Sequence, residues 1–530
     1  MASTDCDKIE TTETDTVAAS SLTVPSTEDV EKAPVDDTGP ITPPPFSIYS
    51  RWEKRLMILG AALSATFSPL TGQIYLPALT VLADEFNVID AEINLTITTY
   101  MIFQGITPMF IGGFADSAGW RPAYLICFVI YIAANVGLAM SQSYTSLLVV
   151  RCIQSAGSAT TIALCQVIVT DIATSAERGQ YMGIMLLPIA IGPSLGPVLG
   201  GALSQYLGWR WIFWVLAILA SVDLVAMLLF FPETCRRIVG DGSVKAHLIY
   251  RTSWKMLADR RPKDENTSDT VSPTSKSAAT LKGAFSLRPL LASITLICTN
   301  LELFVMLMYN AIVFAGPYAV RAALPSQFHA LFELTDLQIG FLYLPMTAGS
   351  IVAAFFSGRS LNWNFCRHAK KQGLQPVDKS RQLCLKGFPI EKARLQAAGP
   401  FLLLSAAVMI TWGWSVEYSG GLAAPCVLMF LLWVGNTGVT NACNALVADI
   451  CPTQAGAASA AGNLTRCLLG AAASAVIVPM IGVLSSGWAY TLMGGLSVLF
   501  APLLLLLMIK GPSWREAFEK KMEDKRALDS

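Results

Sequence analysis

Residues 209–231 read WRWIFWVLAILASVDLVAMLLFF, and this run decides the fold class. Only Arg210 and Asp223 carry a charge in it. A helix needs about 20 mostly apolar residues to cross the hydrocarbon layer of a bilayer. The run therefore predicts a membrane-spanning helix.

Apolar runs of similar length recur on both sides of this one. Composition agrees with membrane embedding, because 53% of the residues are hydrophobic and only 14% are charged, whereas soluble domains carry about 25% charge. We expect an all-α membrane protein with twelve transmembrane helices in two pseudo-symmetric six-helix bundles. The expected spans are 57–82, 93–115, 122–141, 146–173, 180–204, 209–231, 289–320, 336–357, 396–415, 421–448, 456–485 and 488–510.

The polar segments divide the chain. We expect a disordered cytoplasmic tail over 1–50, bundles over 51–231 and 289–510, a cytoplasmic connector over 232–288 and a cytoplasmic tail over 511–530. An internal echo supports the repeat, because Asp171 ends the fourth span in VTDI and Asp449 ends the tenth in VADI. Chance could produce so short a match.

The placement of Lys and Arg predicts the orientation. With both termini in the cytoplasm, 33 of the 37 basic residues lie on the cytoplasmic side. Arg151 and Arg466 fall inside spans, and only Arg210 and Arg321 fall outside the cell. We expect a multi-pass protein of the plasma membrane, or alternatively of a vacuolar or other internal membrane.

Several motifs carry a family resemblance. Residues 112–121 (GGFADSAGWR) resemble the GxLaDrxGrk loop signature of the major facilitator superfamily, and 151–157 (RCIQSAG) resemble its RxxqGxg motif. The segment 192–201 (GPSLGPVLGG) is similar to the gxxxGPxxGG motif of its antiporters. With 74–77 (IYLP), 177–179 (ERG), 208–214 (GWRWIFW), 232–236 (PETCR) and 463–466 (NLTR), they make the chain similar to fungal twelve-spanner drug:proton antiporters.

The resemblance implies a gate in the loop after the second span. Asp116 is expected to pair there with Arg121 and Arg178 and to hold the outward-facing state. The alternative is a solvated loop carboxylate. Trp120 stands where the signature has its first Arg, which weakens the expected charge network.

The fifth span has a pattern of small residues that matches its family motif. Gly192, Gly196 and Gly200 recur every four residues and share one helix face, which lets another backbone approach closely. Pro193 and Pro197 remove backbone donors and bend the helix. The functional interpretation is an antiporter hinge that blocks leak, made of Gly192, Gly196, Pro197, Gly200 and Gly201; the alternative is ordinary tight packing.

Charges inside spans are functional hypotheses by default. Glu302 is expected near the midplane of the seventh span as a proton carrier, or alternatively in a salt bridge with Arg466. Arg151 is expected to contribute to proton coupling or to contact an anion, or to be a fixed structural cation. Asp223 is a further proton-coupling candidate, although a structural role fits its peripheral span.

Amides and hydroxyls could hold a substrate without a fixed charge, and hydrogen bonding between helices is the alternative for each of them. The expected cavity residues are Gln73, Gln104, Gln154, Tyr309, Asn436, Asn441, Asn463 and Arg466.

These features predict a proton-coupled antiporter that exports a small organic molecule by alternating access. Import by proton symport and a non-transporting sensor are the alternatives. An enzyme is disfavoured, because the chain has three histidines and no HExxH, GxSxG or GxxxxGK[ST] motif. We expect no cofactor, no metal and no nucleic acid partner; the partners are a small-molecule substrate, protons and the lipid bilayer, and the chain is expected to be a monomer.

Overall fold

The computed structural model describes residues 49–173, 175–239, 288–371, 388–418, 421–451 and 455–529. Helices make up the regular structure of these ranges, which contain no strand. Residues 1–48 of the expected tail (1–50) and residues 240–287 of the expected connector (232–288) lie outside the described residues.

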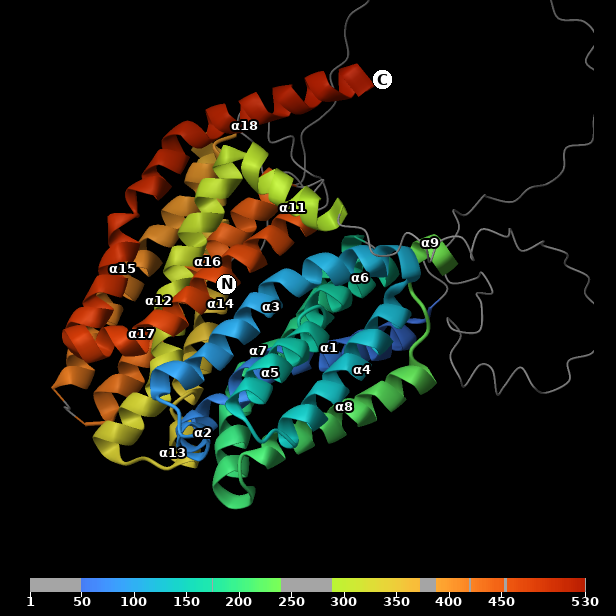
Figure 1. Ribbon diagram of the computed structural model, residues 1–530. Helices are drawn as coiled ribbons and strands as arrows, with labels where there is room; N and C mark the ends of the chain where they lie inside the picture. Colours follow the sequence, from blue (N-terminus) through green and yellow to red (C-terminus); the bar gives the residue numbers. More distant parts are fainter. Residues whose placement is uncertain are drawn as a thin grey trace, which may run out of the picture. The chain divides into compact units, whose positions relative to one another are not determined.

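Helices cover all twelve expected spans (Figure 1). In chain order they are α1 (Arg51–Ile74), η1 (Leu76–Ala78), α2 (Leu79–Phe86), α3 (Asp90–Ala118), α4 (Trp120–Ala139), α5 (Tyr144–Ser158), α6 (Thr161–Ile172), α7 (Ser175–Leu207), α8 (Arg210–Phe230), α9 (Arg236–Val239), α11 (Arg288–Thr299), α12 (Leu301–Phe332), α13 (Asp336–Phe341), α14 (Leu344–Lys371), α15 (Ile390–Glu417), α16 (Ala423–Ile450), α17 (Ala455–Leu499) and α18 (Pro502–Asp529).

Nine helical stretches of the described ranges are long and apolar enough to cross a membrane. The last, Gly456–Phe518, contains two expected spans, and the helix within it breaks at Ser485, where φ is 71°. The expected second and fifth spans, α3 and α7, are not among the nine, although they have 29 and 33 residues.

The seventh span begins and ends later than expected. The Asn300 side chain accepts a hydrogen bond from the Leu303 backbone N–H (3.1 Å) and starts α12 there, so α11 is a separate helix of 12 residues. At its other end α12 continues to Phe332, through Pro317 and Pro325. Arg321, expected in an exterior loop, therefore lies inside a helix, and Glu302, expected near the midplane, lies in a first turn.

Two ends of the helix array are named here by their residues. The connector end is the end where Ala118 and Phe230 lie, and the loop end is the end where Asn87 and Thr335 lie. Pro45–Ser530 forms one compact unit, so contacts do not separate the two expected bundles. The boundaries of the bundles remain a prediction.

Apolar packing differs between these ends. One cluster joins elements from both sides of the chain at the loop end, among them Tyr75, Leu82 and Phe328. At the connector end one cluster is made by residues before 240 and a separate one by residues after 288. Among the described residues, the two parts of the chain thus share an apolar core toward the loop end and form separate cores at the connector end.

Candidate functional site

Arg151 lies on α5 and is 1% exposed. Its Nη1 donates to Gln154 Oε1 at 2.6 Å. Its guanidinium lies over the rings of Tyr75 and Tyr100, 4.1 and 4.8 Å from their centroids. These contacts hold the cation by stacking, and no carboxylate in the described part of the chain forms an ion pair with it.

Gln154 is fixed from its other side. Its Nε2 donates to Asn135 Oδ1 at 2.8 Å, and Asn135 in turn donates to the Tyr131 backbone oxygen. Since the amide has a fixed partner on each side, Gln154 positions Arg151. The sequence predicted Gln154 as a cavity residue; the structure makes it part of the support for Arg151.

Arg321 lies on α12 and was missed as a site residue, because the expected span ended one residue before it. Its guanidinium lies 4.6 Å from the ring centroid of Trp433 on α16 and 5.6 Å from that of Tyr318. Its Nε is buried, and no described residue forms a hydrogen bond with it. Membrane helices tolerate proline. The seventh span could therefore have been extended through Pro317 and Pro325, and this longer span would have included Arg321.

Arg466 lies on α17, with its Nε donating to the Gly462 backbone oxygen at 3.2 Å. Its guanidinium is 5.9 Å from the ring centroid of Phe314 on α12. One turn earlier, Asn463 Nδ2 donates to the backbone oxygen of Gln104 on α3 at 3.1 Å. The Gln104 side chain itself donates to Ser68 Oγ at 3.2 Å. This helix face thus joins the two parts of the chain.

Aromatic rings connect the three arginines. The ring centroids of Phe314 and Tyr318 lie 5.4 Å apart, with the two ring planes tilted. Tyr318 lies within electrostatic range of both Arg151 and Arg321. We name this group the arginine–aromatic cluster. It comprises Arg151, Arg321, Arg466, Tyr75, Tyr100, Phe314, Tyr318 and Trp433.

The arginine–aromatic cluster carries an excess of positive charge. Ion pairs join Arg210 to Glu85, Arg394 to Asp449 and Arg515 to Glu391, and none of these three includes an arginine of the cluster. Buried guanidinium groups are costly unless they are paired. Their planar fork matches carboxylates and phosphates. The arrangement is therefore suited to hold an anionic ligand.

Of the remaining expected cavity residues, Asn436 has a buried polar atom that no described residue contacts by a hydrogen bond, and the others contact neighbouring helices. Asn436 is 7% exposed, and its Oδ1 is buried without a hydrogen-bond partner, one turn after Trp433. Asn441 donates to Ser357 on α14 at 2.9 Å and so joins two helices. Two others also serve packing: Tyr309 donates to the Ser497 backbone oxygen, and Gln73 packs against Gly196.

Glu302 lies with other charged groups at the connector end. Glu302 and Glu391 are both 0% exposed, and Arg515 of α18 lies 2.9 Å from Glu391. A Cβ added to Gly511 would meet the side chains of both glutamates. The structure thus groups Glu302 with Glu391 and Arg515 rather than with Arg466, the partner that the sequence suggested.

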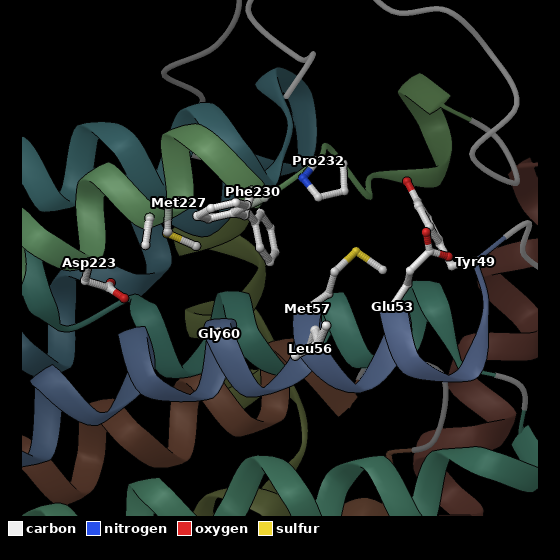
Figure 2. A pocket seen from close by; sticks show the side chains of 11 residues that line it. Tyr49, Glu53, Leu56, Met57, Gly60, Asp223, Met227, Phe230 and Pro232 are labelled. Atoms are coloured by element: carbon white, nitrogen blue, oxygen red, sulfur yellow. The ribbon is translucent and has the colours of Figure 1, made fainter. Parts of the chain in front are cut away.

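Asp223 lies on α8, away from the arginine–aromatic cluster. Its Oδ2 accepts a hydrogen bond from Ser64 Oγ of α1 at 2.7 Å. It lines a cavity between α1 and α8 that is shown in Figure 2.

The loop signature is held by a glutamate that sequence reasoning did not select. Glu233 Oε1 accepts from the backbone N–H of Trp120 at 3.1 Å, and Oε2 accepts from that of Arg121 at 3.1 Å. Thr234 and Cys235 also donate backbone N–H groups to Glu233. Burial raises the pKa of Glu233, and these donors act in the opposite direction. Its position within PETCR was the available signal.

The expected gate is described only in part. Arg121 is 4% exposed, and its Nη2 donates to the Leu228 backbone oxygen at 2.8 Å. Asp116 and Arg178 lie on α3 and α7, but their side chains are outside the described part of the chain. Trp120, which replaces the usual Arg, donates from Nε1 to Asp171 Oδ2 at 2.7 Å.

The glycine face of α7 packs on α1. A Cβ on Gly192 would lie 3.2 Å from Pro69, one on Gly196 would lie 3.0 Å from the Ile74 nitrogen, and one on Gly200 would overlap the Ile74 carbonyl. Cβ atoms added to Gly201 and to Gly340 would overlap backbone on α13 and at Pro197, respectively. The expected hinge residues are therefore positions of backbone contact, both with α1 and across to α13.

Comparisons with known proteins agree with this architecture. Residues 61–475 match the model of the Major Facilitator Superfamily. The MFS-type transporter phiD of a fungal species is 38% identical over 483 residues, which cover 91% of this chain and 72% of phiD. The MFS-type transporter tstD of Talaromyces stipitatus is 36% identical over 483 residues, covering 91% and 86% of the two chains.

One further relative and two solved structures are also similar to this chain. Citrate exporter 1 of Aspergillus niger is 32% identical over 531 residues, covering 96% of this chain and 99% of the relative. A bacterial homolog of the human lysosomal transporter Spinster has a TM-score of 0.56 at 13% identity, covering 89% and 99%. The human organic anion transporter MFSD10 (TETRAN) has a TM-score of 0.52 at 18% identity, covering 86% and 100%. These two structures share the fold.

Proposed function

Because this chain belongs to the Major Facilitator Superfamily, we propose that it exports small organic anions across a membrane in exchange for protons. It is a multi-pass membrane protein and a secondary transporter of small molecules, not an enzyme. The anionic substrate, the export direction and the proton coupling are the proposal.

One observation carries the choice of substrate. The buried Arg151 on α5 and the half-buried Arg321 on α12 and Arg466 on α17 converge through aromatic rings, and no carboxylate of the described residues pairs with any of them. A substrate carboxylate supplies the missing charge and the flat acceptor geometry that guanidinium groups prefer. That one relative is named Citrate exporter 1 is consistent with this chemistry.

Alternating access supplies the transport cycle. Gly201 and Gly340 allow backbone contact at the loop end, where the apolar core is also shared. We infer a state closed at the loop end and open toward the connector end. Anion binding drives the change only by favouring one state, and arginines contributed from both parts of the chain allow an anion to draw these parts together.

The proton is assigned to Glu302 and Glu391. Both carboxyls are buried and adjoin Gly511 of α18, and Arg515 pairs with Glu391 at 2.9 Å. Burial and a neighbouring carboxyl both favour the protonated form of an acid, so this pair is suited to take up a proton. The group joins α12, α15 and α18 and is thus placed to respond when these helices move. Asp116, Arg121 and Arg178 remain the proposed gate, supported by the anchoring of the α4 N-terminus on Glu233.

We further propose a monomer in the plasma membrane with both termini in the cytoplasm. The basic connector supports this orientation. The bundles 51–231 and 289–510 are the moving parts of the proposed cycle.

Transport into proteoliposomes tests the function. Full-length protein is reconstituted, a pH gradient of either sign is imposed, and flux of labelled citrate is compared with that of a neutral sugar and an organic amine. Antiport predicts citrate movement toward the more acidic compartment, whichever way the protein is inserted. Movement toward the alkaline side would indicate symport, and preferential flux of the amine would refute the anion assignment.

A further inference from the structure

A cavity of about 570 Å³ lies between α1 and α8, apart from the arginine–aromatic cluster (Figure 2). Its walls are mostly apolar and two of them are methionines, whose flexible side chains adapt to differently shaped ligands. It is lined by Tyr49, Glu53, Leu56, Met57, Gly60, Asp223, Ala226, Met227, Phe230, Phe231 and Pro232.

The cavity is open to the surroundings of the helix array. Leu56 and Phe230 line it and are 66% and 67% exposed. Both belong to helices that are long and apolar enough to span a membrane. An amphiphile dissolved in the bilayer could therefore enter sideways, without using the route of the transported anion.

The two ends of the cavity carry acidic side chains. Figure 2 shows Asp223 at one end and Glu53 with Tyr49 at the other. Ser64 Oγ, 2.7 Å from Asp223 Oδ2, also lies 3.1 Å from the Gly60 carbonyl oxygen. Within the described ranges no Lys, Arg or His forms an ion pair with Asp223.

A carboxylate inside a spanning helix is costly, and such residues mark ligand or ion sites. A single hydroxyl supplies one hydrogen bond to an ion with about four acceptor positions. An anion would be repelled by Asp223, and an uncharged apolar molecule would leave the carboxylate without a cation. The complementary ligand is a protonated amine.

We propose that this cavity binds an amphiphilic amine, with its ammonium group beside Asp223 and its apolar body along Met57, Met227 and Phe230. Bound there, the amine lies between α1 and α8, on a different face of α1 from that on which α7 packs. The site differs from the anion site in position and in ligand charge, so it does not depend on the proposed substrate.

Photolabelling tests the site directly. Full-length protein in phosphatidylcholine nanodiscs is exposed to dodecylamine that carries a diazirine, and labelled peptides are mapped. Labelling is expected on α1 and α8, and excess unlabelled dodecylamine should suppress it. Dodecanol and dodecanoate probes of the same length, which differ only in the head group, should label these peptides roughly tenfold less.

Three variants complete the test. Asp223→Asn should reduce labelling by the amine roughly tenfold, Ala226→Trp should reduce it by filling the cavity while keeping the carboxylate, and Glu516→Gln should retain it as an exposed control. Competition by phosphatidylethanolamine in the nanodisc would identify a lipid as the source of the amine. Equal labelling by dodecanol, or undiminished labelling of a folded Asp223→Asn protein, would overturn the proposal.

Discussion

At the scale of single residues, the site depends on cations that have aromatic rather than acidic neighbours. Arg151 lies between Tyr75 and Tyr100, and Arg321 lies over Trp433. Stacking supports a guanidinium while leaving its N–H groups available to a ligand. An arginine in a salt bridge, such as Arg394 with Asp449, has its charge neutralised by its partner.

Gly119 provides a residue-scale prediction. It has φ of 99°, and an added Cβ would lie 2.5 Å from Glu233 Oε2. Gly119→Ala should therefore strain the backbone and displace Glu233 from the N-terminus of α4, at a cost of about 1–3 kcal/mol. Thermal unfolding of the purified protein should show a lower Tm.

Gly208→Ala is the matched control for this effect. Gly208 also has a positive φ, 89°, but an added Cβ meets nothing within 4 Å. It should show the backbone strain alone. If Tm falls by the same amount in both variants, the contact with Glu233 contributes nothing to stability.

Single residues also show what could be predicted from sequence. Arg151 and Arg466 stand out because a charge inside an apolar run is rare and costly. Arg321 was missed because the expected span ended at residue 320. Glu302 lies in the first turn of α12 because Asn300 caps the helix there, and the sequence alone did not reveal this helix start. Glu233 was not selected, since its backbone partners at Trp120 and Arg121 are distant in sequence.

At the scale of helices, α7 is a packing element with two contact faces. Its glycines at 192, 196 and 200 meet α1, and Gly201 meets α13. The sequence predicted the shared face from the four-residue spacing alone. The contact with α13 could not be predicted, because nothing local identifies which helix lies opposite.

Gly200→Ala tests this element. The added Cβ would overlap the Ile74 carbonyl, so α1 and α7 must separate and citrate transport should fall at least about tenfold. Gly399→Ala on α15 is the control, because its Cβ meets nothing within 4 Å. Flux is measured in proteoliposomes at equal protein. Unchanged flux in Gly200→Ala would contradict a tight α1–α7 contact.

The group of Glu302 at the start of α12, Glu391 at the start of α15 and Arg515 within α18 gives a second prediction at this scale. Glu302→Gln should abolish citrate movement driven by a pH gradient, while exchange of citrate for citrate continues, because only the proton site is removed. Glu516→Gln, an exposed carboxyl on α18, is the control. Retention of gradient-driven flux in Glu302→Gln would assign the proton elsewhere.

At the scale of the whole chain, membership of the superfamily and the all-helical fold followed from apolar runs and motifs. The sequence did not reveal that the connector end has two separate apolar cores, one formed by residues before 240 and one by residues after 288. Which end is closed depends on side chains that meet across long sequence distances, as Thr98 and Ser474 do at 3.0 Å. A single sequence contains no record of such pairings.

The closed loop end leads to a prediction for the whole chain. An added side chain at Gly340 would overlap the Pro197 carbonyl, so Gly340→Val should favour a state open at the loop end. Spin labels at the exposed Tyr206 and Gln338 should report a longer distance in this variant. Gly358→Val, whose Cβ position is open, should leave the distance unchanged. No lengthening in Gly340→Val would contradict closure through this contact.

The account depends most on an anion being held by the three arginines of the arginine–aromatic cluster, so binding of citrate to the purified protein in nanodiscs is the decisive measurement. Arg151→Gln, Arg321→Gln and Arg466→Gln should each weaken citrate binding by about tenfold or more. Arg210→Gln, which removes an exposed cation paired with Glu85, should bind like the unmodified chain. Unchanged citrate affinity in all three cluster variants would contradict the proposed anion site.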